Sequence, residues 1–98
     1  MTADTLTKPE IKIRMPKMWK VILHNDDRTP MDFVVALLIE VFQHHPLKAT
    51  EIMLNIHEQG GAVVGIYTHE IAEEKAALTK RRAEVAGYPL TATIEEDD

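Results

Sequence analysis

The sequence predicts an α+β domain in which a small antiparallel three-stranded sheet packs against three helices, in the order βααβαβ. Two apolar runs rich in β-branched residues, 19–25 and 62–67, and an alternating segment at 90–94 are typical of strands. The segments between them repeat apolar residues every three or four positions, which indicates amphipathic helices. A chain of 98 residues is long enough for one such domain.

The two ends of the chain differ in composition from its middle. Residues 1–17 contain Pro9 and Pro16 and show no sustained period, so they are predicted to form a flexible N-terminal extension. Residues 18–95 are predicted to be the folded core domain, and residues 96–98 an acidic C-terminal tail.

The first strand and the first helix meet at a short polar junction. Thr29-Pro30-Met31-Asp32 has the pattern of a helix start. Thr29 is predicted to be the N-cap, Pro30 the first helical residue, and Asp32 the partner in a pattern like a capping box. Apolar residues follow at helical spacing, at Phe33, Val34, Leu37, Leu38, Val41 and Phe42.

The later helices carry clear start and stop signals. The second is predicted to begin near Leu47 and to end at Gly60, because glycine adopts the left-handed C-terminal conformation without penalty. Thr68 is expected to cap a third helix that ends at Gly87. That helix has acidic residues early and basic residues late, an order that suits the helix dipole. The apolar side of the second helix consists of Ala49, Ile52, Met53 and Ile56.

Composition excludes several classes of function. A net charge of −5 and a pI near 5.5 argue against nucleic acid as a partner. No apolar run approaches the roughly 20 residues that a membrane helix needs. The absence of cysteine and serine removes disulfides, thiolate metal sites and the commonest nucleophiles. A soluble cytoplasmic protein is the expectation that remains.

Metal binding and catalysis receive little support from the polar residues. His44 and His45 are adjacent, so on a helix they point in different directions and cannot share a metal ion. Asn25-Asp26-Asp27 lacks the glycine and the glutamate of a calcium loop. Asp26, Asp27 and His57 could form an acid/base pair, but no loop that would hold an oxyanion or a phosphate accompanies them. We therefore expect no metal, no cofactor and no enzymatic activity.

The junction after the first strand allows two interpretations. Asn25, Asp26 and Asp27 crowd the approach to a helix start, where such groups either cap the helix or form a site for a cation. His57 flanks the apolar stripe of the second helix and is either bonded to a backbone carbonyl or part of a site. Met31 and Met53 are either core residues or the walls of an adaptable pocket.

Four segments resemble the ClpS adaptors, in register from residue 18 to residue 95. They are residues 19–34, Met53-x-x-Ile56-His57-x-x-Gly60, Tyr67-Thr68-x-Glu70-x-Ala72-x-x-Lys75 and Pro89-Leu90.

The resemblance implies a fold and a function. ClpS-like proteins have a small sheet packed on three helices behind a flexible N-terminal extension, which the family uses to engage its unfoldase. They bind destabilising, bulky hydrophobic N-terminal residues (Leu, Phe, Tyr or Trp). They deliver the bound proteins to the AAA+ unfoldase ClpA, through its N-domain, for degradation by ClpP. The chain is thus expected to be a non-catalytic, monomeric adaptor.

The resemblance also assigns residues to the recognition of a substrate's α-amino group. Asn25 and His57 are the implied direct acceptors, and either Asp27, through a water molecule, or Asp26 supplies negative charge. His57 can accept only through an unprotonated ring nitrogen.

Two further groups of residues follow from the resemblance. Glu70 and Lys75 match the face that docks on ClpA, although a solvated helix start would look the same. The hydrophobic pocket for the substrate side chain is expected to consist of Thr29, Met31, Val34, Met53, Ile56 and Leu90.

Ile56 stands where the family commonly has valine, and we expect its extra methylene to change selectivity among N-terminal residues. Trp19 and Arg28 also depart from the usual pattern. Two alternatives remain: a diverged paralogue with a narrowed substrate range that mainly regulates the unfoldase, and a small structural or ribosome-associated module that binds no peptide.

Overall fold

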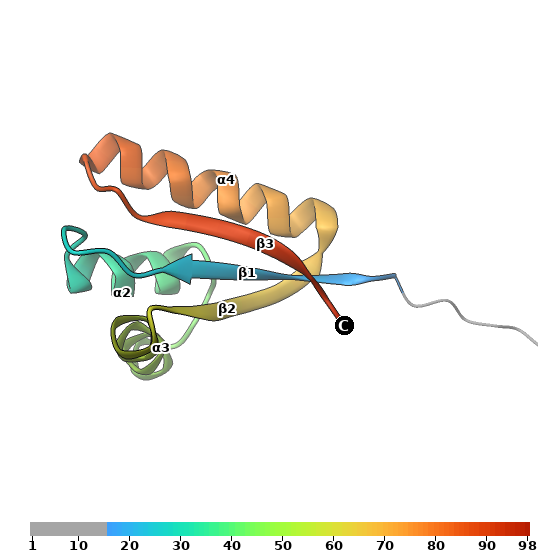
Figure 1. The fold of residues 1–98 in the computed structure, drawn as a ribbon, viewed down its shortest axis with the longest axis horizontal. Helices are drawn as coiled ribbons and strands as arrows, with labels where there is room; N and C mark the ends of the chain where they lie inside the picture. The colour runs from blue at the N-terminus through green and yellow to red at the C-terminus, as the bar shows by residue number, and fades with distance from the viewer. Residues whose placement is uncertain (1–15) are drawn as a thin grey trace, which may run out of the picture.

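The computed structural model describes residues 16–98, and its elements follow the predicted order βααβαβ (Figure 1). Residues 1–15 lie outside the described residues, so the predicted N-terminal extension is not described beyond Pro16 and Lys17. The elements are β1 (Met18–His24), α2 (Met31–Glu40), α3 (Pro46–Gln59), β2 (Gly61–Thr68), α4 (His69–Ala86) and β3 (Thr91–Asp97).

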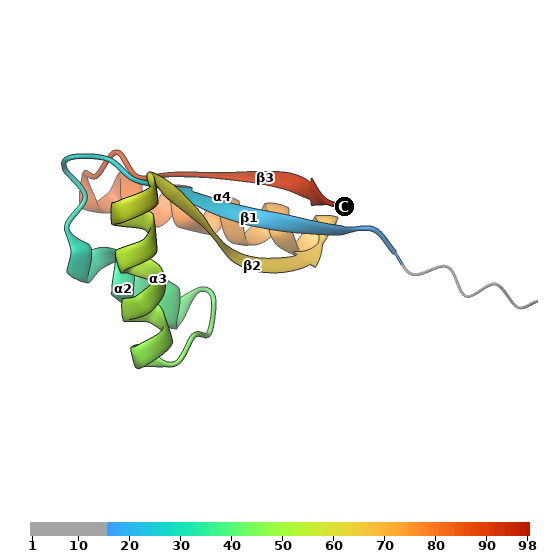
Figure 2. The same ribbon diagram turned by 60° about the horizontal axis from the view of Figure 1, so that its bottom comes forward.

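The three strands form one antiparallel sheet in the order β2-β1-β3 (Figure 2). The pairing of β1 with β2 shifts between Val21, opposite Gly65, and Ile22, opposite Val63. Val64 is therefore the extra residue of a β-bulge, which bends the strand locally. β1 is the central strand, so the loop that follows it starts between the ends of β2 and β3.

The core lies between one face of the sheet and the helices. Val21 and Leu23 have no exposed surface, whereas Ile22 between them is only half-buried. This alternation shows that one face of β1 is fully covered. The helices contribute the apolar positions that their period predicted, and Leu37 and Leu38 are among the most buried.

The C-terminal strand β3 differs from its predicted boundaries. The last strand is longer than the predicted segment 90–94, because Glu96 and Asp97 pair with the beginning of β1. Lys17 also forms an ion pair with Glu96 at 2.9 Å. Glu96 and Asp97, predicted to belong to the acidic tail, are therefore part of the sheet.

The predicted helix stops are confirmed, and one cap is new. Gly60 and Gly87 end α3 and α4 with φ values of 88° and 82°, in the left-handed region. His45 precedes α3, and its Nδ1 accepts a hydrogen bond from the backbone of Leu47 at 3.2 Å. Thr68 precedes α4 as predicted, but its side chain makes no capping hydrogen bond.

Helix α4 holds the C-terminal end of α2 through two cations. The Nζ of Lys75 donates to the carbonyl oxygen of Val41 at 2.6 Å and to Oε1 of Gln43 at 3.1 Å. Arg82 forms an ion pair with Glu40. These contacts fix α2 relative to the sheet, and with it the residues at the opposite end of α2. Within residues 16–98, no helix is long and apolar enough to cross a membrane.

Candidate functional site

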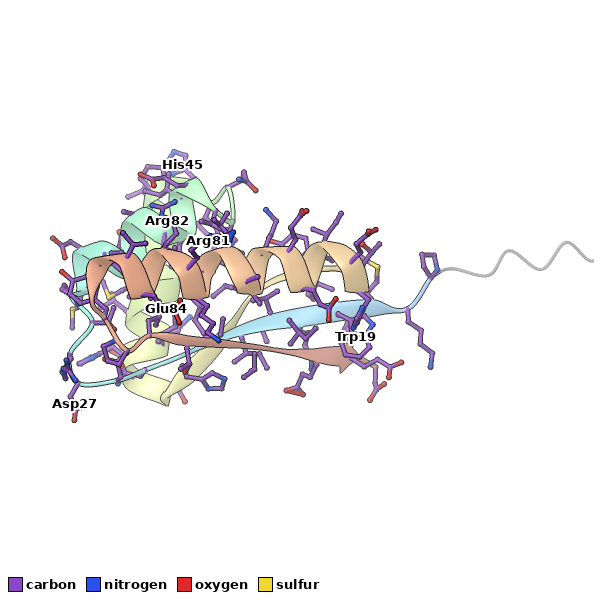
Figure 3. All side chains as sticks on the ribbon, turned by 90° about the horizontal axis from the view of Figure 1, so that it is seen from above. Trp19, Asp27, His45, Arg81, Arg82 and Glu84 are labelled. Atoms are coloured by element: carbon purple, nitrogen blue, oxygen red, sulfur yellow. The ribbon has the colours of Figure 1, made fainter. Side chains whose placement is uncertain are left out.

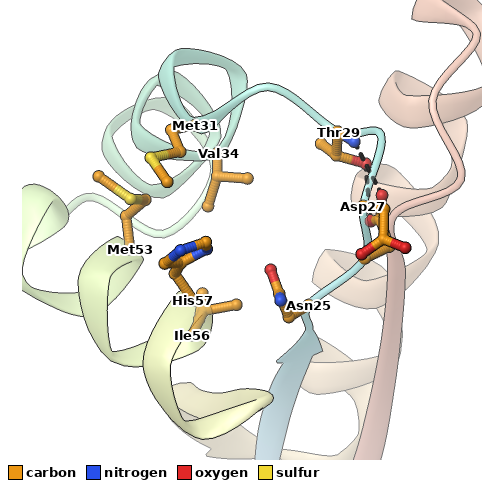
Figure 4. A pocket seen from close by; sticks show the side chains of 9 residues that line it. Asn25, Asp27, Thr29, Met31, Val34, Met53, Ile56 and His57 are labelled. Atoms are coloured by element: carbon orange, nitrogen blue, oxygen red, sulfur yellow. Dashed lines mark hydrogen bonds between the residues drawn. The ribbon is translucent and has the colours of Figure 1, made fainter.

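A hollow of about 260 Å³ opens where β1 ends, between the loop that leads to α2 and the last turns of α3 (Figure 4). It is lined by residues from the loop, from the first turns of α2 and from the second half of α3. Its lining residues are Asn25, Asp26, Asp27, Thr29, Met31, Val34, Met53, Ile56 and His57. Residues far apart in the sequence thus line one hollow.

One end of the hollow is polar. Asn25 directly follows β1, and its backbone N–H donates to the carbonyl oxygen of Gly60 at 3.0 Å. This bond ties the loop to the end of α3, one turn from His57. Figure 4 shows the side chains of Asn25 and His57 facing the same space from these two elements. Both side chains are exposed, so a ligand can reach them from solvent.

Both carboxylate oxygens of Asp26 accept hydrogen bonds from within the loop. Its Oδ1 accepts hydrogen bonds from the backbone N–H groups of Arg28 and Thr29 at 2.8 and 2.7 Å. Its Oδ2 accepts from the Thr29 hydroxyl at 2.8 Å. Partial burial by itself raises the pKa of Asp26, but these hydrogen bonds and the charge of Arg28 together lower it below its ordinary value of 3.8. The carboxylate is therefore stabilised in its charged form by the turn that it organises.

The prediction that Thr29 is the N-cap of the first helix was wrong. Pro30 occupies the N-cap position and Met31 is the first helical residue, with no side chain capping the helix. The hydroxyl of Thr29 instead donates to Asp26, which lies three residues earlier. An Asp-x-x-Thr spacing is a recognisable signal for such a side-chain turn, and it was missed.

Asp27 is the free carboxylate of the loop. Its side chain is exposed, and it has no hydrogen-bond or ion-pair partner among residues 16–98. Of the two adjacent aspartates, only this one has both oxygens available to a ligand at the mouth of the hollow.

The other end of the hollow is apolar and is built on packed helices. Val34 of α2 and Met53 and Ile56 of α3 are buried, with exposed fractions of 6%, 9% and 3%. Met31 is 45% exposed and lies at the rim. Thioether side chains adapt their shape to a ligand more easily than branched ones, so this end combines a fixed floor with an adjustable wall.

Leu90 does not line this hollow. It is only 4% exposed and belongs to the main core. It borders a different hollow of about 550 Å³ between α4 and β3, together with Tyr88 and Thr93. The predicted place of Leu90 in the hydrophobic pocket therefore needs correction, because the packing of the sheet against α4 encloses its side chain.

The two residues predicted to dock on a partner differ in their surroundings. Glu70 lies exposed in the first turn of α4. The ammonium group of Lys75 instead points to the end of α2, with the rings of Phe42 and Tyr67 at 5.9 and 5.3 Å. The docking role of both residues stays a prediction, and Lys75 has a structural role that the sequence did not reveal.

The arrangement can hold a group that carries both a positive charge and an apolar side chain. Oxygen and nitrogen acceptors and one free carboxylate lie at one end, and buried aliphatic groups at the other. Among residues 16–98, no three or more His, Cys, Asp and Glu side chains gather as metal ligands would. The fold and the hollow thus define a small α+β binding domain.

Comparison with known proteins gives the family. The family model of the ATP-dependent Clp protease adaptor protein ClpS matches residues 14–93, and the chain belongs to this family. It is 53% identical over 93 residues to the ATP-dependent Clp protease adapter protein ClpS of Nitratidesulfovibrio vulgaris (Miyazaki F), covering 95% of this chain and 93% of that one. It is 46% identical over 99 residues to the ClpS of Acetivibrio thermocellus, covering 99% and 100%.

A solved structure agrees with the fold. Agrobacterium tumefaciens ClpS2 bound to L-phenylalaninamide superimposes with a TM-score of 0.82 at 38% sequence identity. The match covers 85% of this chain and 100% of that one. The chain is therefore an adapter of the Clp protease, a non-catalytic protein. Family membership removes the alternative of an unrelated structural or ribosome-associated module.

Proposed function

We propose that this adaptor binds proteins whose first residue is Leu, Phe, Tyr or Trp and delivers them to the ClpA unfoldase for degradation by ClpP in the cytoplasm. The observation that carries the proposal is the hollow, where free acceptors and buried apolar groups lie side by side. A first residue is the only part of a protein that combines a free α-amino group with a side chain on the same carbon.

The ligand of the solved relative supports this assignment. L-phenylalaninamide has a free α-amino group, a benzyl side chain and an amide in place of the next peptide bond. It is chemically a first residue and nothing more. A relative with 38% identity that binds it makes the same chemistry the simplest ligand for this chain.

The polar end is suited to the α-amino group. This cation has three donors, for which we assign Asn25 and His57 as direct acceptors and Asp27 as the source of negative charge, through a water molecule. Asp26 holds the turn that presents them, because both of its oxygens are already bonded. Each charge-assisted bond contributes about 1.5–3 kcal/mol when shielded from water.

The apolar end accommodates the side chain of that same residue. Burying a Leu or Phe side chain contributes about 1.5–3 kcal/mol. Micromolar affinity needs about 8 kcal/mol after the cost of association is met, so neither end is sufficient alone. A leucine inside a chain lacks the amino group and is therefore rejected. All lining residues come from one copy, so a monomer suffices for binding.

Ile56 is the feature of the hollow that we expect to set its selectivity. It is 3% exposed and lines the apolar end, where the family commonly has valine. The extra methylene reduces the space for the largest side chains and can change discrimination by about 1–3 kcal/mol. This is the observation that favours the second candidate, a diverged paralogue with a narrowed range that mainly regulates the unfoldase.

Fluorescence anisotropy with three peptides tests the recognition mechanism. We expect a Leu-initiated peptide to bind, and its N-acetylated twin and a Val-initiated peptide to bind at least about tenfold more weakly, because each loses one of the two contributions. Equal binding of the acetylated twin would overturn the role of the amino group.

Delivery is tested with a Leu-initiated reporter, ClpA, ClpP and ATP. Added adaptor should accelerate degradation of this reporter and leave a Met-initiated twin unchanged. A reporter that binds the adaptor but is degraded no faster would favour the regulatory alternative. In the same assay, replacing Glu70 by arginine tests its docking role, with exposed Glu58 on α3 as the matched control.

A further inference from the structure

The outer face of α4 carries an apolar stripe that nothing in the described part of the chain covers. Ile71, Leu78 and Val85 are 43%, 37% and 83% exposed. They are seven residues apart, nearly two helical turns, so they follow one line along the helix. Figure 3 looks onto this helix, on which Arg81 and Arg82 are labelled. Leu78 and Val85 also line a shallow hollow of about 270 Å³ with these two arginines.

The charged residues of α4 change sign at the middle of the stripe, from mainly acidic to mainly basic. Leu78 lies at its centre, with Ile71 seven residues before it and Val85 seven residues after it. Acidic residues predominate in the first half of the helix and basic residues in the second. Before Leu78 the helix carries Glu70, Glu73 and Glu74 against one cation, Lys75, and after it Lys80, Arg81 and Arg82 against one anion, Glu84.

We propose that a second copy of this chain packs on this face, with the two α4 helices antiparallel about a two-fold axis at Leu78. The two Leu78 side chains then meet, and Ile71 of each copy contacts Val85 of the other. An isologous interface requires a surface that is complementary to itself, and this pattern meets the requirement.

Glu74 and Arg81 supply the electrostatic match. They lie four residues before and three residues after Leu78, so helical geometry puts them on the same flank of the stripe. The two-fold axis places Glu74 of one copy opposite Arg81 of the other, and the pair occurs twice. On the opposite flank the cations are already satisfied within one copy, since Arg82 pairs with Glu40 and Lys75 with the end of α2.

The size of the contact indicates a weak dimer. One helix face with three apolar residues falls below the roughly 1,200 Å² of stable interfaces, so we expect a dissociation constant on the order of 100 μM. No residue of α4 lines the hollow of the candidate site, so the dimer leaves that site open. The stripe includes Ile71, next to Glu70. If the proposed function is right, dimer formation and docking on ClpA therefore exclude each other.

Sedimentation of the full chain across a concentration series tests the dimer. The mass should rise from one copy toward two, and Leu78→Glu should abolish the rise. Leu54→Glu is the matched control, because Leu54 is 44% exposed but lies on α3, away from the stripe. A wild type that stays at the mass of one copy, or equal effects of the two variants, would overturn the proposal.

A charge exchange tests the antiparallel geometry. Glu74→Arg alone should weaken the dimer, and Glu74→Arg combined with Arg81→Glu should restore it. A double variant as weak as the single one would overturn the arrangement. Binding of the Leu-initiated peptide should be unchanged in Leu78→Glu. Retained peptide binding without self-association in the wild type would disprove the dimer and leave the proposed function intact.

Discussion

The two ends of the hollow are built in opposite ways. The polar end is a loop whose shape depends on three hydrogen bonds to one aspartate, and its functional side chains are exposed. The apolar end consists of side chains buried between two packed helices. Ligand recognition and stability are therefore separable at the polar end, because exposed side chains contribute little to folding. At the apolar end the same atoms serve both purposes.

Removing one acceptor of the amino group should reduce peptide binding strongly while leaving stability almost unchanged. Asn25→Ala should weaken binding of a Leu-initiated peptide by about 1.5–3 kcal/mol, roughly 10- to 150-fold, because a charge-assisted hydrogen bond is lost. The free energy of unfolding should change by less than about 0.5 kcal/mol, since the side chain is exposed.

Peptide titration and urea unfolding of the same variant measure the two effects. Asn55→Ala is the matched control, since Asn55 is also exposed but does not line the hollow. If both asparagine variants bind like the wild type, Asn25 is not an acceptor.

Within the polar end, the two neighbouring aspartates are expected to have different roles. Asp26→Ala should lower the free energy of unfolding by about 1–2 kcal/mol, because Thr29 and Arg28 lose their acceptor. Asp27→Ala should leave stability unchanged and weaken peptide binding, most strongly at low salt. Urea unfolding and anisotropy of both variants separate these roles. The opposite assignment, with Asp27→Ala destabilising and Asp26→Ala not, would contradict the division that the loop geometry indicates.

Features of the fold and the site that depend on residues close in sequence could be predicted, whereas those that depend on residues distant in sequence could not. The order of elements followed from apolar periodicity, and the glycine stops from the left-handed conformation, both local properties. The turn at Asp26 is also local, but the same Thr29 matches a helix cap, and the sequence pattern alone did not choose between them. The resemblance to ClpS supplied the site residues that periodicity could not distinguish from core.

Long-range contacts account for what the sequence did not reveal. Leu90 was expected in the pocket, but it borders a hollow that residues of α4 and β3 line, and this packing depends on the assembled sheet. Lys75 contacts Val41, 34 residues earlier, which no spacing rule indicates. The length of β3 likewise depends on its pairing with β1.

The lowered pKa of Asp26 predicts how the loop responds to acid. Its pKa in the folded chain lies below its ordinary value, so its charged form stabilises the fold. That contribution is complete above about pH 4, the range of an unfolded aspartate, and is lost as the pH falls through the lower folded value. The stability difference between wild type and Asp26→Ala should therefore shrink on acidification. Urea titrations at a series of pH values measure it, and a difference that grows toward low pH would contradict the sign.

A substitution at Ile56 tests the apolar end, where the same side chain contributes to stability and to recognition. Ile56→Val removes one buried methylene and should cost about 0.5–1.5 kcal/mol of stability. The same change enlarges the hollow, so the ratio of Trp- to Leu-initiated peptide binding should rise, by at most about 1–3 kcal/mol.

Ile52→Val separates the two consequences of that substitution. Ile52 is 7% exposed on the same helix, one turn earlier, but does not line the hollow. The Ile52→Val variant should lose a similar amount of stability, with no change in the ratio of Trp- to Leu-initiated peptide binding. If Ile56→Val also leaves the ratio unchanged, the methylene serves only the core, and selectivity among bulky residues must then come from the rim at Met31. The adjustable wall, rather than the fixed floor, would in that case determine which first residues are accepted.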